Sequence, residues 1–384
     1  MYPATVILRS TAAALCLLSL APLRGEEKYP LPQAHLLEPF WRQPEVYGEA
    51  VACLRDRPGE PATGTLLFAP AKILRVQSSY GKTVYQEGVD YEVDKANRRL
   101  IIPASSRIAV LDKKDLYKSA TDQQAMKHKA GDPTTYLFYA EAWFRTIQVE
   151  VDYVRDEEWT GYRPAVGSLP ATKARLREGK PLTICVTGDS IAAGANASKT
   201  KAPFMPAYPR LIQQALEATW KSPVALHNLA IPGTTAKGGL DRIHQILEKK
   251  PDLVIIAFGM NDVAEKKPGY YAERITAMIK AIREQSPGTE CIIVTSTLAN
   301  PEWSWSPAEE FPKYREAILP LAGEGVALAD MTRLTSDIIQ KKSYFDLTGN
   351  GINHPNDYMH RLYAQVVLSL LSDQAGDTSP ESAY

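Results

Sequence analysis

The sequence predicts an α/β protein in which a β-rich N-terminal region precedes a domain built on a five-stranded parallel sheet. Short apolar segments without long helical patterns fill residues 64–155, whereas apolar segments alternate with amphipathic ones from Pro181 onward. Such alternation is typical of a parallel sheet that helices cover on both faces. The length of 384 residues also exceeds what one core usually organises, so we expect two domains.

Residues 26–155 are predicted to form a small β-sandwich or jelly-roll domain. The segments 91–93 and 100–102 flank a polar turn, as in a β-hairpin. Ile147, Val149 and Val151 alternate with polar residues, as in a half-buried strand. Two further short apolar segments, 65–68 and 73–76, are candidate strands.

Residues 156–180 are interpreted as a linker that contains a short helix at 171–178, and residues 181–373 as the α/β domain. The five predicted strands of this domain are Leu182–Thr187, Val224–Leu229, Leu253–Phe258, Cys291–Thr295 and Val326–Ala329. The predicted helices are Tyr208–Trp220, Leu240–Lys249, Tyr270–Gln285, Lys313–Leu321 and Tyr358–Leu371. Residues 374–384 form a polar tail that we expect to be disordered.

The first 25 residues are typical of a secretion signal. Arg9 precedes an apolar stretch, Thr11 to Ala21, which is too short to span a bilayer. Pro22 disfavours cleavage after Ala21, so we expect cleavage after Gly25. These features predict a secreted or periplasmic protein without stable membrane insertion after cleavage, and an uncleaved N-terminal anchor is the alternative.

Charge and cysteine content exclude several classes of function. The chain has 44 Lys and Arg against 44 Asp and Glu, so nothing indicates a nucleic-acid partner. Removal of the signal would leave Cys53, Cys185 and Cys291, and three cysteines cannot form a disulfide framework. No Cys/His cluster has the spacing of zinc ligands, so we expect neither a metal nor another cofactor.

Polar residues follow the first three predicted strands of the α/β domain. Gly188-Asp189-Ser190 follows the first, Gly233 lies in the loop after the second, and Asn261 follows the third. The carboxyl ends of parallel strands lie along one edge of a sheet, so we expect these residues to converge. Each group alone is a common turn sequence.

The chemistry of the converging residues is complementary when His354, near the end of the chain, joins them. Ser190 can act as a nucleophile if His354 accepts its proton. The backbone N–H groups of Ser190 and Gly233 and the side-chain amide of Asn261 could form an oxyanion hole. The sequence around Ser190 is not G-x-S-x-G, which argues against the nucleophile elbow of the α/β-hydrolases.

The chain resembles the SGNH hydrolases, also called GDSL-type esterases and lipases, over residues 181–371. The resemblance rests on four motifs in the same order: Gly188-Asp189-Ser190, Gly233, Asn261 and His354. The resemblance implies a flavodoxin-like three-layer α/β/α fold and metal-free hydrolysis of esters. It implies Ser190 as nucleophile, His354 as base, and Ser190, Gly233 and Asn261 as the oxyanion hole.

One position departs from the family pattern. The family usually carries an aspartate three residues before the histidine, and Gly351 stands there instead. Asn350 and Asn353 are nearby, but an amide can hold the wrong tautomer of the imidazole. Three alternatives are open: a backbone carbonyl orients His354, Asp346 folds back to do so, or the site is impaired.

We expect a serine esterase that removes short, foremost acetyl, groups from a small-molecule or polysaccharide ester. A β-rich domain before the hydrolase is similar to the arrangement in some carbohydrate esterases. A lipase or lysophospholipase acting on longer chains is one alternative, although no long apolar lid is evident, and a non-catalytic glycan-binding protein is the other. Trp303 and Trp305 could stack on a sugar or pack their own loop.

Overall fold

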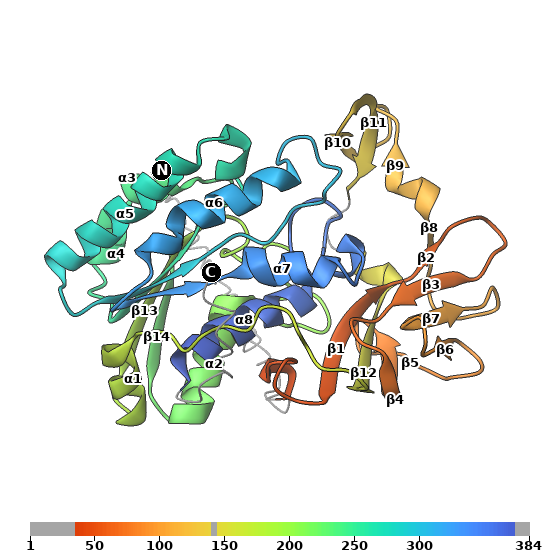
Figure 1. Ribbon diagram of the computed structural model, residues 1–384, viewed down its shortest axis with the longest axis horizontal. Helices are drawn as coiled ribbons and strands as arrows, with labels where there is room; N and C mark the ends of the chain where they lie inside the picture. The colour runs from red at the N-terminus through yellow and green to blue at the C-terminus, as the bar shows by residue number, and fades with distance from the viewer. Residues whose placement is uncertain (1–34, 140–143, 373–384) are drawn as a thin grey trace, which may run out of the picture.

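The computed structural model describes residues 35–139 and 144–372. The predicted signal, residues 1–25, and the predicted tail, residues 374–384, lie outside the described residues. Figure 1 shows a β-rich N-terminal part beside an α/β part. One continuous hydrophobic cluster runs through both parts, from Val51 and Val151 to Ile255 and Val367. The two parts therefore share buried surface.

The α/β part contains the predicted five-stranded parallel sheet, in the order β14-β13-β15-β16-β17. The bounds are β13 Leu182–Gly188, β14 Val224–Asn228, β15 Leu253–Ala257, β16 Glu290–Val294 and β17 Val326–Ala329. All residues of β15 and β16 are buried, as expected for strands covered on both faces. This strand order is that of flavodoxin-like folds, whose ligands bind at the carboxyl ends of the strands.

Helices cover both faces of this sheet (Figure 1). Helices α1, α2 and α8 contact one another on one side, and α3, α4, α5 and α6 do so on the other. The bounds are α1 Pro170–Arg177, α2 Tyr208–Trp220, α3 Ala236–Asp241, α4 Ile243–Leu247, α5 Pro268–Gln285, α6 Phe311–Ile318, α7 Met331–Ile339 and α8 Asp357–Leu371. Short 3₁₀ helices are η4 Asp262–Glu265, η5 Ala308–Glu310, η6 Leu319–Leu321 and η7 Tyr344–Asp346.

Two predictions about helices are corrected. The single helix predicted at Leu240–Lys249 is two short helices, α3 and α4, which meet at Arg242. Helix α7 was not predicted, although Asp330 caps it by accepting a hydrogen bond from the backbone N–H of Arg333 at 3.0 Å. The linker helix is confirmed within one residue as α1.

The N-terminal part contains mostly antiparallel sheets, in the orders β1-β12-β4-β5, β6-β7-β3-β2-β8 and β10-β11-β9. The strands are β1 Glu45–Ala52, β2 Leu54–Arg55, β3 Ala62–Thr65, β4 Pro70–Ser78, β5 Val84–Tyr85, β6 Glu92–Asp94, β7 Arg99–Ile102, β8 Leu111–Asp112, β9 Tyr117–Lys118, β10 Ala125–Lys129, β11 Asp132–Phe138 and β12 Gln148–Arg155, with short helices η2 Lys113–Leu116 and η3 Phe144–Ile147.

The expected hairpin is the antiparallel pair β6–β7. Ile147, Val149 and Val151 are all buried, as their alternation predicts. The candidate strand at 65–68 is wrong beyond Thr65, because the backbone leaves the sheet there and Leu67 N–H donates to Glu49 Oε1 at 2.8 Å.

Candidate active site

Ser190 lies just beyond the carboxyl end of β13, where the sequence predicts it. Gly188 ends the strand, and a Cβ at this position would lie 2.5 Å from the carbonyl oxygen of Ala257. Only glycine lets β13 and β15 approach so closely. Asp189 then shapes the turn, because its Oδ1 accepts a hydrogen bond from the N–H of Ile191 at 2.9 Å.

The imidazole of His354 contacts two side chains of the loop that follows β13. Its Nε2 lies 2.9 Å from Ser190 Oγ, and its Nδ1 lies 3.0 Å from Asn196 Oδ1. An amide oxygen only accepts hydrogen bonds, so this contact requires the proton of the neutral ring on Nδ1. The lone pair of Nε2 then faces the serine hydroxyl, which is the arrangement a general base needs.

The sequence patterns did not indicate a role for Asn196. Its backbone has φ +61°, a left-handed conformation that asparagine adopts more readily than most residues. A Cβ at Gly349 would lie 2.7 Å from Asn196 Cβ, so this glycine allows the His354 loop to approach Asn196. The one sequence signal is a polar side chain within a loop of small residues, six positions after Ser190.

Asn350 organises the loop that carries His354. Its Oδ1 accepts hydrogen bonds from the backbone N–H groups of Ile352, Asn353 and His354 at 2.9–3.1 Å. Its Nδ2 donates to Asn353 Oδ1 at 3.1 Å. The two amides that the sequence places near the histidine therefore build its loop, and the two ring nitrogens face Ser190 and Asn196 instead.

The position where the family carries an aspartate cannot hold one here. Gly351 has φ +86°, and a Cβ there would lie 2.5 Å from a ring carbon of Phe144 and 2.8 Å from the carbonyl oxygen of Phe138. Any side chain would clash with backbone and aromatic ring at this point. Phe138 and Phe144 belong to the N-terminal part, so the packing between the two parts occupies this space.

Asp346 does not face His354, which corrects one of the alternatives for the third residue. Its Oδ1 accepts a hydrogen bond from the N–H of Ala52 at 2.6 Å, and its Oδ2 accepts one from the N–H of Ser343 at 3.1 Å. Burial raises the pKa of Asp346 to about 6, and the ammonium of Lys342, 3.5 Å away, opposes this shift. Asp346 joins the two parts of the molecule, and neither it nor a backbone carbonyl takes the place beside Nδ1 that Asn196 occupies.

The N-terminal part supports both loops of the site. Arg145, in η3, donates from Nη1 to the carbonyl of Ala202 at 3.1 Å and from Nη2 to the carbonyl of Asn196 at 3.4 Å. Gln148, in β12, donates from Nε2 to the carbonyls of Phe345 and Thr348 at 2.7 and 2.9 Å. One short segment therefore holds the Asn196 loop and the His354 loop together.

Gly233 and Asn261 lie in loops that are linked to the end of β13. The backbone N–H of Ile231 donates to the carbonyl of Gly188 at 3.0 Å, which ties the Gly233 loop to the nucleophile strand. Gly233 has φ +77° and open space around its Cβ position. Asn261 Nδ2 donates to the carbonyl of Thr234 at 2.9 Å, and its second N–H is available to a substrate. The loops of the three predicted oxyanion donors are thus connected.

Two buried carboxyl groups lie behind these loops. Burial raises the pKa of Asp189 to about 7 and that of Asp262 to about 6. Asp262 Oδ1 accepts a hydrogen bond from the N–H of Ala236 at 2.8 Å, whereas its Oδ2 is buried without a hydrogen-bond partner among the described residues. Asp262 therefore supports the first residue of α3 and not its own short helix.

A cleft of about 360 Å³ opens beside Ser190 and His354. Its wall includes the small residues Ala193, Gly194 and Ala195. The long side chains of Lys199 and Lys201 also line it. Within residues 35–139 and 144–372, no three His, Cys, Asp or Glu side chains are grouped as a metal site.

One comparison with known protein families gives a match. Residues 186–362, which include Ser190, Gly233, Asn261 and His354, match the model of the GDSL-like lipase/acylhydrolase family. No curated protein sequence matches the chain.

Similar solved structures include three esterases or lipases. A two-domain esterase active on acetylated mannans is 21% identical, with 54% of each chain covered and a TM-score of 0.43. The chain thus spans about half of that esterase. An acetylxylan esterase from Geobacillus stearothermophilus is 16% identical over 53% of this chain and 100% of its own, with a TM-score of 0.43. A lipase/acylhydrolase from Enterococcus faecalis is 22% identical over 52% of this chain and 99% of its own, with a TM-score of 0.41.

The family match and the parallel sheet lead to the same assignment. Residues 186–362 form a GDSL-like lipase/acylhydrolase domain, which is built on the five-stranded parallel sheet.

Proposed function

We propose that this hydrolase removes acetyl or other short acyl groups from a carbohydrate, with Ser190 as nucleophile and His354 as general base. The observation that carries the proposal is the 2.9 Å contact between Ser190 Oγ and His354 Nε2, with Asn196 on the far side of the ring. This arrangement also supports an enzyme over a glycan-binding protein that has lost activity.

In the first step, Ser190 Oγ attacks the ester carbonyl while its proton passes to His354 Nε2. The carbonyl oxygen becomes an oxyanion, which the N–H groups of Ser190 and Gly233 and the amide of Asn261 stabilise; one such donor contributes on the order of 3 kcal/mol. The C–O bond to the alcohol breaks, and His354 returns its proton to the leaving alkoxide. The products are an acyl-serine and the free sugar hydroxyl.

Water releases the acyl group in a second half-reaction, in which water is the nucleophile and Ser190 Oγ is the leaving group. His354 takes a proton from water as the water oxygen attacks the acyl-serine carbonyl, and it then returns that proton to Ser190 Oγ. The acid leaves, and the serine is restored. Neither half of the reaction needs a group beyond those in the site.

Asn196 fixes the tautomer of His354 but carries no charge. A carboxylate in this place would also stabilise the imidazolium that forms during each proton transfer. We therefore expect a slower chemical step than a carboxylate would give, with the mechanism otherwise intact.

The wall of the cleft favours a short acyl group on a polar substrate. Among its described lining, the residues nearest Ser190 in sequence are the small Ala193, Gly194 and Ala195, and no large aliphatic or aromatic side chain lines it. A long acyl chain gains affinity mainly by burying its methylene groups against apolar side chains. This cleft offers too little apolar surface for that.

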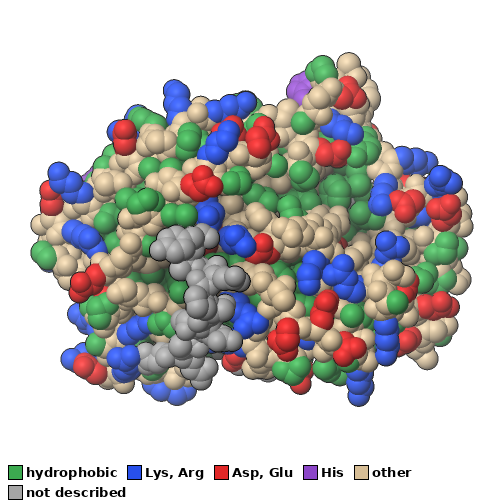
Figure 2. All heavy atoms as spheres, in the orientation of Figure 1, with side chains coloured by type: hydrophobic (Ala, Val, Ile, Leu, Met, Phe, Trp, Pro, Cys, Tyr) green, Lys and Arg blue, Asp and Glu red, His purple; other side chains and the backbone are tan. Residues whose placement is uncertain are grey.

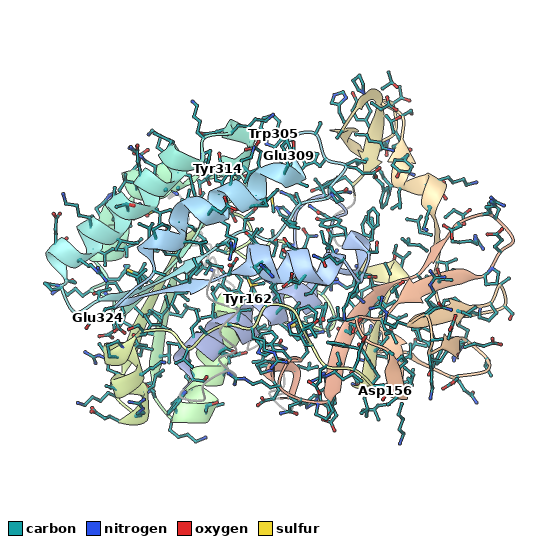
Figure 3. All side chains as sticks on the ribbon, viewed as in Figure 1. Asp156, Tyr162, Trp305, Glu309, Tyr314 and Glu324 are labelled. Atoms are coloured by element: carbon teal, nitrogen blue, oxygen red, sulfur yellow. The ribbon has the colours of Figure 1, made fainter. Side chains whose placement is uncertain are left out.

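Trp305 supports a carbohydrate as the carrier of the ester. Its side chain is 60% exposed, and Figure 3 shows it next to Glu309 at the N-terminal end of α6. The hydroxyl of neighbouring Ser306 lies 3.5 Å from the carbonyl of Met260, one residue before Asn261. An exposed aromatic ring near the oxyanion loop can stack on a sugar. Trp303 is buried and packs its own loop.

The β10–β11 hairpin of the N-terminal part holds the loop that carries Trp305. The N–H of Ala130 donates to the carbonyl of Glu302 at 2.7 Å, and Ser304 Oγ donates to the carbonyl of His128 at 3.0 Å. We infer that the N-terminal part shapes the substrate side of the site as well as its catalytic loops.

Export from the cytoplasm is part of the proposal and rests on residues 1–25, which are typical of a secretion signal. Among the helices of residues 35–139 and 144–372, none is both long and apolar enough to cross a bilayer. Edman sequencing of the mature protein from the medium or periplasm should begin at Glu26.

The test compares the protein and its Ser190→Ala variant on acetyl, butyryl and octanoyl p-nitrophenyl esters and on acetylated xylan. We expect release of acetate from xylan that the substitution lowers by at least ~10⁴-fold, as for the loss of a catalytic serine elsewhere. A preference for the octanoyl ester would instead indicate a lipase. Turnover that does not depend on Ser190 would contradict the proposal, and so would no turnover at all.

A further inference from the structure

The cleft beside Ser190 is lined by three cationic side chains: Arg145, Lys199 and Lys201. No aspartate or glutamate belongs to its described lining. Elsewhere the charges are mixed, since the chain has no net charge and Figure 2 shows basic and acidic side chains interspersed over one face. The cleft therefore differs in charge from the protein as a whole.

The charge of Arg145 is partly balanced from within the protein. Its Nη1 lies 4.0 Å from Asp357 Oδ2, and both side chains are almost fully buried. Its guanidinium is also engaged with the carbonyls of Asn196 and Ala202. Arg145 thus serves mainly to hold the loop, and the two lysines supply the excess charge.

Lys199 and Lys201 have no carboxylate partner within ion-pair distance among the described residues, where many other surface lysines do. Lys129, Lys237 and Lys313, for example, each form an ion pair at 2.7–3.1 Å. A substrate anion at the cleft would therefore not have to compete with a protein carboxylate for these two ammonium groups.

The exposed side chain of Lys199 places its ammonium beside the wall of the cleft. Its Nζ lies 3.9 Å from the position that a Cβ on Gly194 would occupy, and Gly194 lines the cleft. Burial lowers the pKa of His360 to about 4; the Ala195 carbonyl and Asp357 oppose this shift, and the charges of Lys199 and Arg145 add smaller lowering contributions. His360 Nε2 contacts the carbonyl of Ala195, so this positive field extends to the residue beside Asn196.

Hydrogen bonds fix the backbone that carries the two lysines. The N–H of Ser198 donates to Asp357 Oδ1 at 2.8 Å, and the hydroxyl of Ser198 accepts from the N–H of Met205 at 2.9 Å. The N–H of Lys201 donates to the carbonyl of Ser198 at 2.9 Å. These bonds hold the backbone of the two lysines at the cleft, and their exposed side chains can adjust to a substrate.

We propose that the natural substrate is an anionic carbohydrate, in which a carboxylate or sulfate next to the acylated sugar binds Lys199 and Lys201 while the ester reaches Ser190. This inference rests on the proposed function and adds the charge of its substrate. A cleft with charge of one sign raises the local concentration of a substrate of the opposite sign. Exposed lysine–anion contacts are individually weak, so we expect the pair to change kcat/KM by about tenfold.

The test uses two forms of one polymer that differ only in charge. O-acetylated polygalacturonate with free carboxylates is compared with the same polymer after methyl esterification, at low salt. We expect kcat/KM to be about tenfold higher for the charged form. Lys199→Gln/Lys201→Gln should abolish this preference, because the rate on the charged form falls to that on the neutral form.

The matched control is Lys249→Gln/Lys250→Gln, which removes the same charge beside the start of β15, at the opposite end of the sheet from Ser190. It should keep the preference of the wild type. Acetylated cellulose with and without sulfate groups forms a second pair, and the pair with the larger lysine-dependent preference identifies the anion.

Equal rates on charged and neutral forms of both polymers would overturn the inference, and so would a preference that survives the double substitution. In either case, acetate release from the neutral polymer that depends on Ser190 would leave the proposed function standing. Absence of any release that depends on Ser190 would instead contradict the proposed function.

Discussion

The two nitrogens of the His354 ring face two differently built regions of the molecule. On the Nε2 side, Ser190 follows β13, in a sheet whose strands are covered on both faces. On the Nδ1 side, Asn196 sits in an irregular loop that Arg145 of the N-terminal part holds by its backbone carbonyl. Regular secondary structure positions Ser190, the proposed nucleophile, whereas contacts between residues far apart in sequence position Asn196, the group proposed to orient the base.

Packing of the N-terminal part against the hydrolase domain accounts for the difference between the two sides of the His354 ring. Phe144 fills the space where an aspartate would stand at position 351, and Arg145 and Gln148 then hold the loops of Asn196 and His354. The segment 144–148 therefore leaves no room for the family's usual aspartate and also holds the loop of Asn196, which lies beside His354 Nδ1 in its place. The following three substitutions test this division of roles.

The largest effect on stability is expected for Asp346→Ala. The substitution leaves the buried ammonium of Lys342 with one partner fewer and removes the acceptor of the Ala52 N–H. Breaking a buried ion pair typically costs about 3–5 kcal/mol, and urea denaturation measures it. Because Asp346 does not contact His354, kcat of the folded variant should stay within about tenfold of the wild type, whereas a loss near ~10⁴-fold would make Asp346 the missing acid.

An intermediate effect is expected for Arg145→Met, which removes both hydrogen bonds to the carbonyls of Asn196 and Ala202. Displacement of a catalytic group by about 1 Å can cost up to ~10²-fold, so we expect kcat on a neutral ester to fall by about 10- to 100-fold with a small change in KM. Arg145→Lys should restore part of the rate. Arg107→Met, which removes an arginine that pairs with Asp90 in the N-terminal part, is the control and should leave kcat unchanged. A lowered Tm with unaltered kcat in Arg145→Met would show a structural role alone.

The residues on the Nε2 side of His354 were predictable because the topology of the sheet brings the ends of its strands together. The strand order and the alternation of apolar and amphipathic segments bring the ends of β13, β14 and β15 together, so Ser190, Gly233 and Asn261 could be grouped in advance. The sequence pattern around His354 also indicated it as the candidate base.

The residues on the Nδ1 side of His354 were not predictable because no local sequence pattern indicates their contacts. The role of Asn196 depends on Gly349, more than 150 residues away, and on Arg145, 51 residues away in the opposite direction. Asp346 was a reasonable candidate by its distance in sequence from His354, yet its carboxylate faces Ala52 and Ser343. Helix α7 and the short strands of the N-terminal part escaped prediction because their apolar patterns are brief.

The smallest effect is expected for Asp262→Asn, on the Nε2 side of His354. Burial raises the pKa of Asp262 to about 6, so the folded protein binds its proton more tightly than the unfolded chain does. Wild-type stability should therefore fall as the pH rises from about 4 to 6 and stay lowered above that, and the variant should not show this component.

The measurement is urea denaturation of both proteins at pH 5 and pH 8. Relative to the wild type, Asp262→Asn should gain roughly 1–2 kcal/mol of stability on going from pH 5 to pH 8. A difference in stability that is the same at both values would show that Asp262 is not a buried carboxylate with a raised pKa.

The central claim is that the amide of Asn196 orients the catalytic base, and a pair of substitutions tests it most directly. Asn196→Leu keeps the approximate size of the side chain but removes the acceptor of His354 Nδ1, whereas Asn196→Asp keeps an acceptor and adds a charge. The measurement is kcat and KM on p-nitrophenyl acetate. We expect kcat of Asn196→Leu to fall by about 10²-fold or more at unchanged KM, and Asn196→Asp to match or exceed the wild type. A kcat of Asn196→Leu within about threefold of the wild type, in a folded protein, would contradict the claim.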